Sequence, residues 1–111
     1  MSEQYKVHIT RYAYDQMKDI RRYITEELFA PDAAKNLLIA IREAIGSLQT
    51  MPSRHQLVNE EPWRTEGIRR LIVRNFYLYY WTDEKKKQVH ITAVIYGRRN
   101  QNEQLEYMEI E

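Results

Sequence analysis

The sequence predicts an α+β fold in which two helices pack on one face of a small antiparallel sheet. Apolar residues recur every three to four positions between residues 13 and 48, which is the helical period. From residue 68 to residue 96 the period changes to two, and β-branched and aromatic side chains dominate. The length of 111 residues is that of one ordinary domain, so we expect a single domain over residues 1–111.

The first half of the chain predicts a short strand followed by a helical hairpin. Residues 5–9 alternate in polarity, as a strand does, and Thr10 then suits the cap of a helix. The first helix takes its apolar face from Ala13, Met17, Ile20, Ile24 and Leu28. Pro31 suits the first turn of a second helix. The apolar stripe of that helix consists of Leu37, Leu38, Ile41, Ala44, Ile45 and Leu48.

The second half predicts three strands that follow a loop at residues 52–66. We expect the strands at about residues 68–73, 76–82 and 89–96. A tight turn near Arg74 and Asn75 separates the first two, and the charged segment DEKKKQ separates the last two. Because short turns join consecutive strands, these strands must be antiparallel.

Alternation along the strands predicts which side chains face the helices and which face away from them. In the last strand the helix-facing set is Val89, Ile91, Ala93 and Ile95, and the opposite set is His90, Thr92, Val94, Tyr96 and Arg98. The other strands add to the opposite set Arg70, Arg74, Tyr77, Tyr79 and Trp81. Arg69 fits this division only if it lies on an edge strand.

This opposite face is expected to be an open surface on which arginines alternate with aromatic rings. Single-stranded nucleic acid binds such surfaces, because guanidinium groups contact phosphate and rings stack on bases. Two alternatives stay open. Cross-strand aromatic pairs stabilise a sheet without any ligand, and the same surface would suit a bound peptide.

Composition excludes several classes of site and locates a basic region. Residues 63–100 hold nine Lys and Arg against three acidic residues, whereas residues 101–111 hold four glutamates and no basic residue. The basic region indicates a polyanion or an acidic partner. With no cysteine and with histidines only at positions 8, 55 and 90, we expect no disulfide, metal site or cofactor. The sequence shows no secretion signal or membrane span, so a cytoplasmic location is expected.

Three segments in order carry a family resemblance: AAKNLLIAIREAIGSLQTMP, GIRRLIVRNFYLYYW and AVIYGRRNQ. Together they resemble the toxins of the RelE/ParE superfamily of bacterial type II toxin–antitoxin systems, nearer the ParE and plasmid-stabilisation toxins than compact RelE. The resemblance covers nearly the whole chain. It implies a growth inhibitor that a cognate antitoxin neutralises. The implied targets are mRNA on the ribosome, which an mRNA interferase would cut, or DNA gyrase; a decayed module that only binds antitoxin and a homodimeric state stay open.

The resemblance also implies site residues. Arg70 and Arg99 match basic positions that would stabilise charge on a phosphate in a metal-free endoribonuclease. Tyr77 stands where the nuclease members carry arginine, and Tyr107 approximates a terminal tyrosine with its spacing shifted by two. These four are the candidate catalytic residues, although the sequence shows no clear acid–base pair. The candidate nucleic-acid or partner-binding residues are Arg69, Arg74, Tyr79, Trp81, His90, Tyr96 and Arg98.

Overall fold

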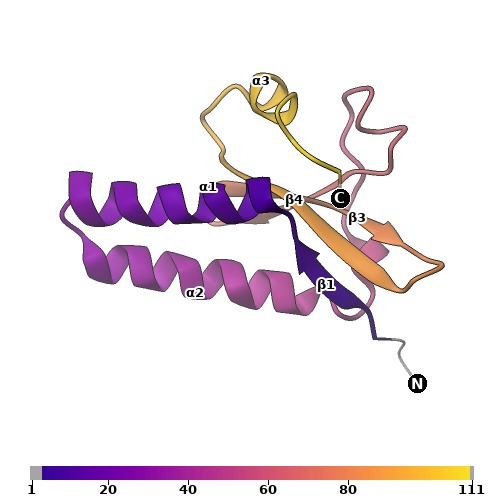
Figure 1. The fold of residues 1–111 in the computed structure, drawn as a ribbon, viewed down its shortest axis with the longest axis horizontal. Coiled ribbons are helices and arrows are strands. Elements are labelled where there is room, and N and C mark those ends of the chain that lie inside the picture. Colours follow the sequence, from indigo (N-terminus) through magenta and orange to yellow (C-terminus); the bar gives the residue numbers. More distant parts are fainter. Residues whose placement is uncertain (1–3, 111) are drawn as a thin grey trace.

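The computed structural model describes residues 4–110, where a four-stranded sheet carries a hairpin of two long helices on one face (Figure 1). The long elements are β1 (Lys6–Ile9), α1 (Arg11–Arg22), α2 (Pro31–Ser47), β2 (Arg69–Val73), β3 (Phe76–Asp83) and β4 (Gln88–Tyr96). A π-helical turn (Tyr23–Glu27), a 3-10 turn (Pro52–Arg54) and the short helix α3 (Gln101–Leu105) complete the fold. The predicted α+β class, the helical hairpin and the meander are confirmed. The sequence analysis did not predict α3.

The strands are arranged in the order β1-β4-β3-β2. The three strands of the meander are antiparallel, as their short turns require, whereas β1 runs parallel to β4. β2 is therefore an edge strand, and this position accommodates Arg69, which is half-buried rather than enclosed.

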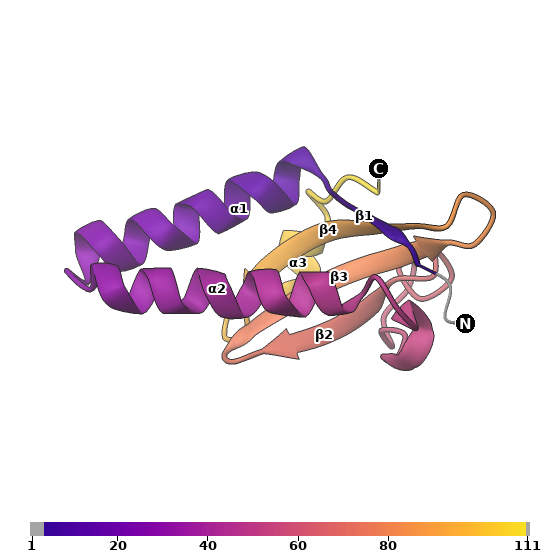
Figure 2. The same cartoon turned by 90° about the horizontal axis from the view of Figure 1, so that it is seen from below.

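Both helices begin at the residues that their sequence signals indicate. The Thr10 hydroxyl accepts a hydrogen bond from the Ala13 N–H at 3.2 Å, and Pro31 is the first residue of α2. The tip of the hairpin extends beyond the sheet in both views (Figures 1 and 2). No helix among residues 4–110 is long and apolar enough to cross a membrane.

Leu28 does not lie on the buried face of the first helix, as its spacing predicted. Its side chain is 54% exposed, and that of Phe29 is 85% exposed. The reason is the π-helical turn, in which the Leu28 N–H donates to the Tyr23 carbonyl five residues earlier. The wider turn changes the helical period and rotates Leu28 away from the core.

The first core lies between the helices and the sheet. Ile41 of α2, Leu48 at its C-cap and the sheet residues Tyr80 and Ile91 are each 0% exposed. Leu71 of β2 and Phe76 of β3 pack against the same cluster. The apolar faces of the helices therefore pack against the sheet, as the helical spacing of their residues predicted.

The opposite face of the sheet is not open, so that expectation is wrong. A second core covers it, in which Tyr79 and Leu105 are each 2% exposed and Ile68 is 0% exposed. The covering groups come from the loop at residues 55–67 and from the segment that contains α3, both on the side of the sheet away from α2 (Figure 1). Neither covering segment has a regular apolar period, so sequence periodicity could not reveal the cover.

A β-bulge also reverses the alternation halfway along β4. Tyr79 pairs with Ala93 and Tyr80 pairs with Ile91, so Thr92 is an extra residue without a partner in β3. Ala93 and Ile95 therefore turn to the second core, and Val94 turns to the first. The prediction that Val89, Ile91, Ala93 and Ile95 share one face is wrong for this reason.

Candidate functional site

The end of β4 is fixed against the β2–β3 turn by Gly97. Its N–H donates to the Asn75 carbonyl at 2.8 Å. A Cβ atom at this position would lie 3.1 Å from the Asn75 oxygen and 3.3 Å from the Tyr77 ring, which is too close for an unstrained side chain. Only glycine allows this approach without displacement. The two arginines that follow, Arg98 and Arg99, are both exposed. Together with Gly97 they form the GRR turn, residues 97–99.

Two of the four candidate catalytic residues contact one another beside this turn. The Arg70 guanidinium lies 4.7 Å from the centre of the Tyr77 ring, which is a cation–π contact. Since the same ring lies against Gly97, it links the edge strand to the turn that carries Arg98 and Arg99. Arg70 itself is exposed.

Gln101, which the sequence analysis did not single out, holds the same turn. Its amide nitrogen donates to the carbonyl oxygens of Tyr96 at 2.8 Å and Arg99 at 2.9 Å. Its amide oxygen accepts a hydrogen bond from the Tyr79 hydroxyl at 2.9 Å. A polar residue just after the GRR segment was the only sequence signal for this role.

Tyr79 does not offer a stacking surface, contrary to its predicted role. Its ring is buried and its hydroxyl is bonded to Gln101. Burial raises the pKa of Tyr79 to about 12, although the nearby Arg70 acts in the opposite direction. At neutral pH the phenol therefore keeps its proton and cannot serve as a base.

Arg99 and Tyr107 act electrostatically on Tyr12, a residue of α1 that was not predicted from the sequence. Burial raises the pKa of Tyr12, the neighbouring Tyr107 raises it further, and Arg99 lowers it. The Tyr12 hydroxyl donates to the Gln104 carbonyl at 2.9 Å. Tyr107 is 67% exposed. This group therefore consists of one cation and two phenols, of which Tyr12 is held in its neutral form.

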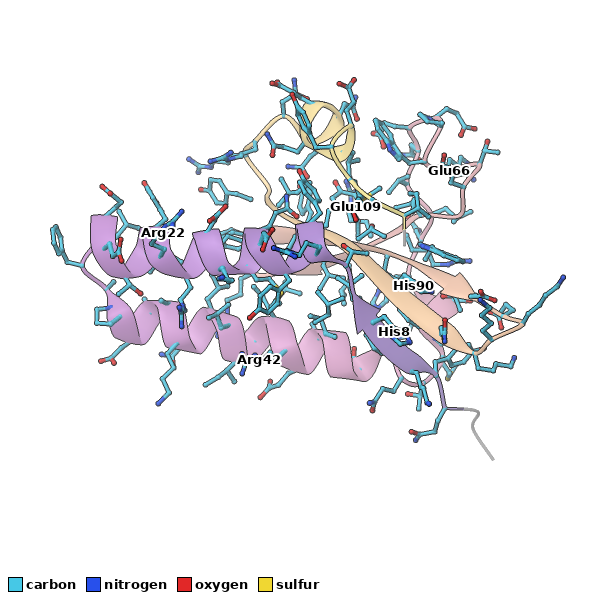
Figure 3. All side chains as sticks on the ribbon, in the orientation of Figure 1. His8, Arg22, Arg42, Glu66, His90 and Glu109 are labelled. Carbon is cyan, nitrogen blue, oxygen red and sulfur yellow. The ribbon has the colours of Figure 1, made fainter. Side chains whose placement is uncertain are left out.

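Three rings form a stack on neighbouring strands. His90 lies 4.6 Å from Trp81 of β3 and 5.5 Å from His8 of β1, measured between ring centroids. Figure 3 shows the two histidines side by side. His90 is near the start of β4 and Gly97 follows its end, a separation of roughly 20 Å for an extended strand. His90 is therefore too far from the GRR turn to transfer a proton there.

The remaining predicted binding residues lie on different sides of the sheet or in its turns. Arg69 donates to the His55 carbonyl at 2.6 Å, and on the helix-facing side it partly offsets the burial that raises the pKa of Tyr80. Because the bulge reverses the alternation, Tyr96 packs against Phe76 at 5.4 Å on the helix-facing side as well. Arg74 is exposed in the β2–β3 turn. The predicted gathering of all these side chains on one face is therefore wrong.

A groove of about 950 Å³ opens between α1, the π-helical turn and the ends of β3 and β4. Ile20, Ile24, Phe76, Val94 and Tyr96 form its apolar lining. Charges of both signs stand around it, among them Glu26, Arg22 and Arg99. An apolar floor with a mixed charged rim is the composition of a site for a protein segment.

The arginines beside the GRR turn lack ion-pair partners in the part of the chain that the structure describes. The ion pairs found there join Arg11 to Asp15, Arg22 to Asp19 and Lys87 to Glu84. Arg70, Arg98 and Arg99 are thus available to an anionic partner. Among residues 4–110, no three His, Asp or Glu side chains are placed to hold a metal ion.

Comparison with known proteins supplies the family context. The family model described as the ParE toxin of the type II toxin–antitoxin system parDE matches residues 7–101. The chain resembles a chromosomal ParDE system from P. aeruginosa, with a TM-score of 0.69, 20% identity, and coverage of 86% of this chain and 98% of that one.

A second solved structure shares the fold. The RelBE2 toxin–antitoxin complex from Mycobacterium tuberculosis matches with a TM-score of 0.58 and 19% identity, covering 84% of this chain and 91% of that one. No curated protein matches the sequence.

Proposed function

Because the chain belongs to the family of ParE toxins of type II toxin–antitoxin systems, we propose that it stops growth by binding DNA gyrase. In this proposal the toxin acts as a binding protein in the cytoplasm, and a cognate antitoxin neutralises it. The observation that supports binding over hydrolysis is the state of the groups around the GRR turn. They supply positive charge, and burial keeps the phenols of Tyr79 and Tyr12 beside them in the protonated form.

RNA cleavage by the ribose 2′-hydroxyl needs a base for that proton and an acid for the leaving oxygen. Burial raises the pKa of Tyr79 to about 12, so its phenol stays protonated at neutral pH, and burial raises the pKa of Tyr12 as well. His90 is stacked at the other end of β4. The arginines could stabilise charge on a phosphate, but they cannot carry out the proton transfers because guanidinium stays protonated.

The proposed antitoxin contact is the groove beside α1. Its apolar lining would bury an amphipathic segment, and its rim would pair with charges of both signs. Phe29 and Leu28, exposed at the hairpin tip, would extend this apolar surface.

The test is a gyrase supercoiling assay with the purified protein. We expect inhibition or trapped cleavage complexes. Arg99→Ala should weaken the effect by about tenfold if Arg99 is a central contact. Arg42→Ala is the matched control, since Arg42 is an exposed arginine on α2 away from the GRR turn (Figure 3). Normal supercoiling at all toxin concentrations would reject gyrase as the target.

A second mechanism is favoured by one contact. Arg70 over Tyr77, joined to the GRR turn through Gly97, would suit a phosphate group in an mRNA interferase. In a translating extract this mechanism predicts cuts in mRNA that Arg70→Ala abolishes. If the mRNA stays intact at toxin concentrations that stop growth, this mechanism is rejected. If neither assay responds and expression leaves growth unchanged, the chain is a module that only binds antitoxin.

A further inference from the structure

The C-terminal segment, residues 102–110, lies beyond the part of the chain that matches the family model, which ends at residue 101. It carries Glu103, Glu106 and Glu109 and no Lys or Arg, next to the most basic part of the sequence. Instead of leading away from the domain, the segment folds back over the second face of the sheet.

Buried apolar side chains hold this segment in place, together with hydrogen bonds from two aromatic side chains to its backbone carbonyls. Leu105 is 2% exposed, and Met108 and Ile110 pack against the second core. The Trp81 indole N–H donates to the Ile110 carbonyl at 2.6 Å. The Tyr12 hydroxyl donates to the Gln104 carbonyl.

The glutamates of the segment take no part in this attachment. Glu103, Glu106 and Glu109 are all exposed, and no ion pair joins them to a described residue. Their charge therefore contributes a negative potential to the surface near Arg99 without fixing the segment. Replacing the three glutamates with glutamine should therefore change the electrostatic potential near Arg99 and leave the apolar contacts of the segment intact.

The surface beneath the segment has the chemistry that single-stranded nucleic acid binds. Tyr79 and Trp81 would present rings on neighbouring positions of one strand face, and Arg70 is paired in register with Tyr79. While the segment is attached, Tyr79 is buried and Trp81 is half-buried. A short segment that is held by few buried side chains opens at a lower free energy than the core does.

We propose that residues 102–110 form an autoinhibitory strap, which shares the cover of the Tyr79–Trp81 face with the loop at residues 55–67 and keeps single-stranded nucleic acid from that face until the strap is released. The glutamates oppose a polyanion electrostatically, and the apolar anchors block the rings sterically. The proposal does not depend on the target of the toxin, since it concerns a face of the sheet rather than the groove or gyrase.

The first test measures binding of a fluorescent twelve-nucleotide oligothymidylate by anisotropy at low salt. The strap variant carries Glu103→Gln, Glu106→Gln and Glu109→Gln in the full chain. It should bind about fivefold or more tightly than the unmodified chain, because three nearby negative charges are removed. The control carries charge changes of the same kind on α2, Asp32→Asn and Glu43→Gln, which lie outside the groove that holds Arg99, and should bind less than about twofold more tightly.

The second test reports release of the strap directly. Since the chain has no cysteine, Glu109→Cys gives a single position for a bimane label, which nearby tryptophan quenches. We expect quenched bimane in the free protein and a rise in its emission when the oligothymidylate binds. Binding with unchanged quenching would overturn the proposal. So would equal affinities for the strap variant and the hairpin control, or no measurable binding by any of the three proteins.

Discussion

The two faces of the sheet are both buried, yet they are buried by different kinds of structure. Tyr79 and Tyr80 are neighbours in β3 and point to opposite faces, with 2% and 0% of their surfaces exposed. Tyr80 lies under two long helices, whereas Tyr79 lies under a loop and a five-residue helix near the end of the chain. Equal burial therefore does not mean equal resistance to opening.

The charged side chains that are proposed to bind a partner also lie beside only one of the two cores. Arg70 and Tyr77 lie together beside the second core, and the GRR turn adjoins them. The helix-facing core is lined by aliphatic and aromatic side chains. The helix-facing core is the more extensive of the two, while the proposed binding groups lie at the second face under a lighter cover.

The largest expected effect separates the two faces by stability. Ile41→Ala empties a fully buried position between α2 and the sheet and should lower the free energy of unfolding by about 2–5 kcal/mol. Urea unfolding followed by circular dichroism measures it. Ile39→Ala is the control, because Ile39 on the same helix is 45% exposed and should cost far less. Similar losses for both variants would contradict the assignment of this core.

The second prediction compares the two tyrosines through alkaline pH. An unfolded phenol ionises near its ordinary pKa of 10, whereas burial raises the pKa of Tyr79 and of Tyr80 to about 12. Each therefore contributes stability below pH 10 that is lost as the pH rises from 10 toward 12, by up to roughly 2 kcal/mol.

The measurement is the free energy of unfolding between pH 8 and pH 11.5. Tyr79→Phe and Tyr80→Phe should each make its decline shallower. If one of the two substitutions leaves the slope unchanged, that tyrosine is more accessible to hydroxide than its burial implies, and its face opens more easily.

The third prediction concerns the lighter cover. Leu105→Ala should lower the free energy of unfolding by about 1–2 kcal/mol, less than Ile41→Ala, because a short segment with few buried side chains can open locally without unfolding the rest. Hydrogen exchange should quicken within residues 101–110 while β3 and β4 stay protected. A loss as large as that of Ile41→Ala would show that the two faces unfold as one unit.

The smallest effect is expected at the bulge that separates the faces. The Thr92 hydroxyl donates to the Tyr79 carbonyl at 3.3 Å, and its own carbonyl accepts from the Thr10 hydroxyl at 3.4 Å. Thr92→Val removes the first bond and should cost about 0.5–1.5 kcal/mol in thermal unfolding. Ser53→Ala, which removes an exposed hydroxyl, serves as the comparison, and an equal cost there would argue against a role for the bulge.

Local patterns were sufficient for the elements but not for the second face. Thr10 and Pro31 marked the two helix starts, and the strands began and ended within one residue of their predicted bounds. The open arginine–aromatic face failed because two aperiodic segments cover it and because one extra residue in β4 reverses the alternation. The contact of Arg70 with Tyr77 lies within the predicted set, whereas the roles of Tyr12 and Gln101 depend on residues far apart in the chain.

Local sequence patterns were enough to predict the α+β class, the helical hairpin, the meander and the family resemblance, because periodicity, caps and turns act over a few neighbouring residues. The pairing of β1 with β4, the exchange of faces at the Thr92 bulge and the cover over Tyr79 become visible only in the folded chain. Each of these depends on contacts between segments distant in sequence. Their free energies are set by packing in three dimensions rather than by local preference.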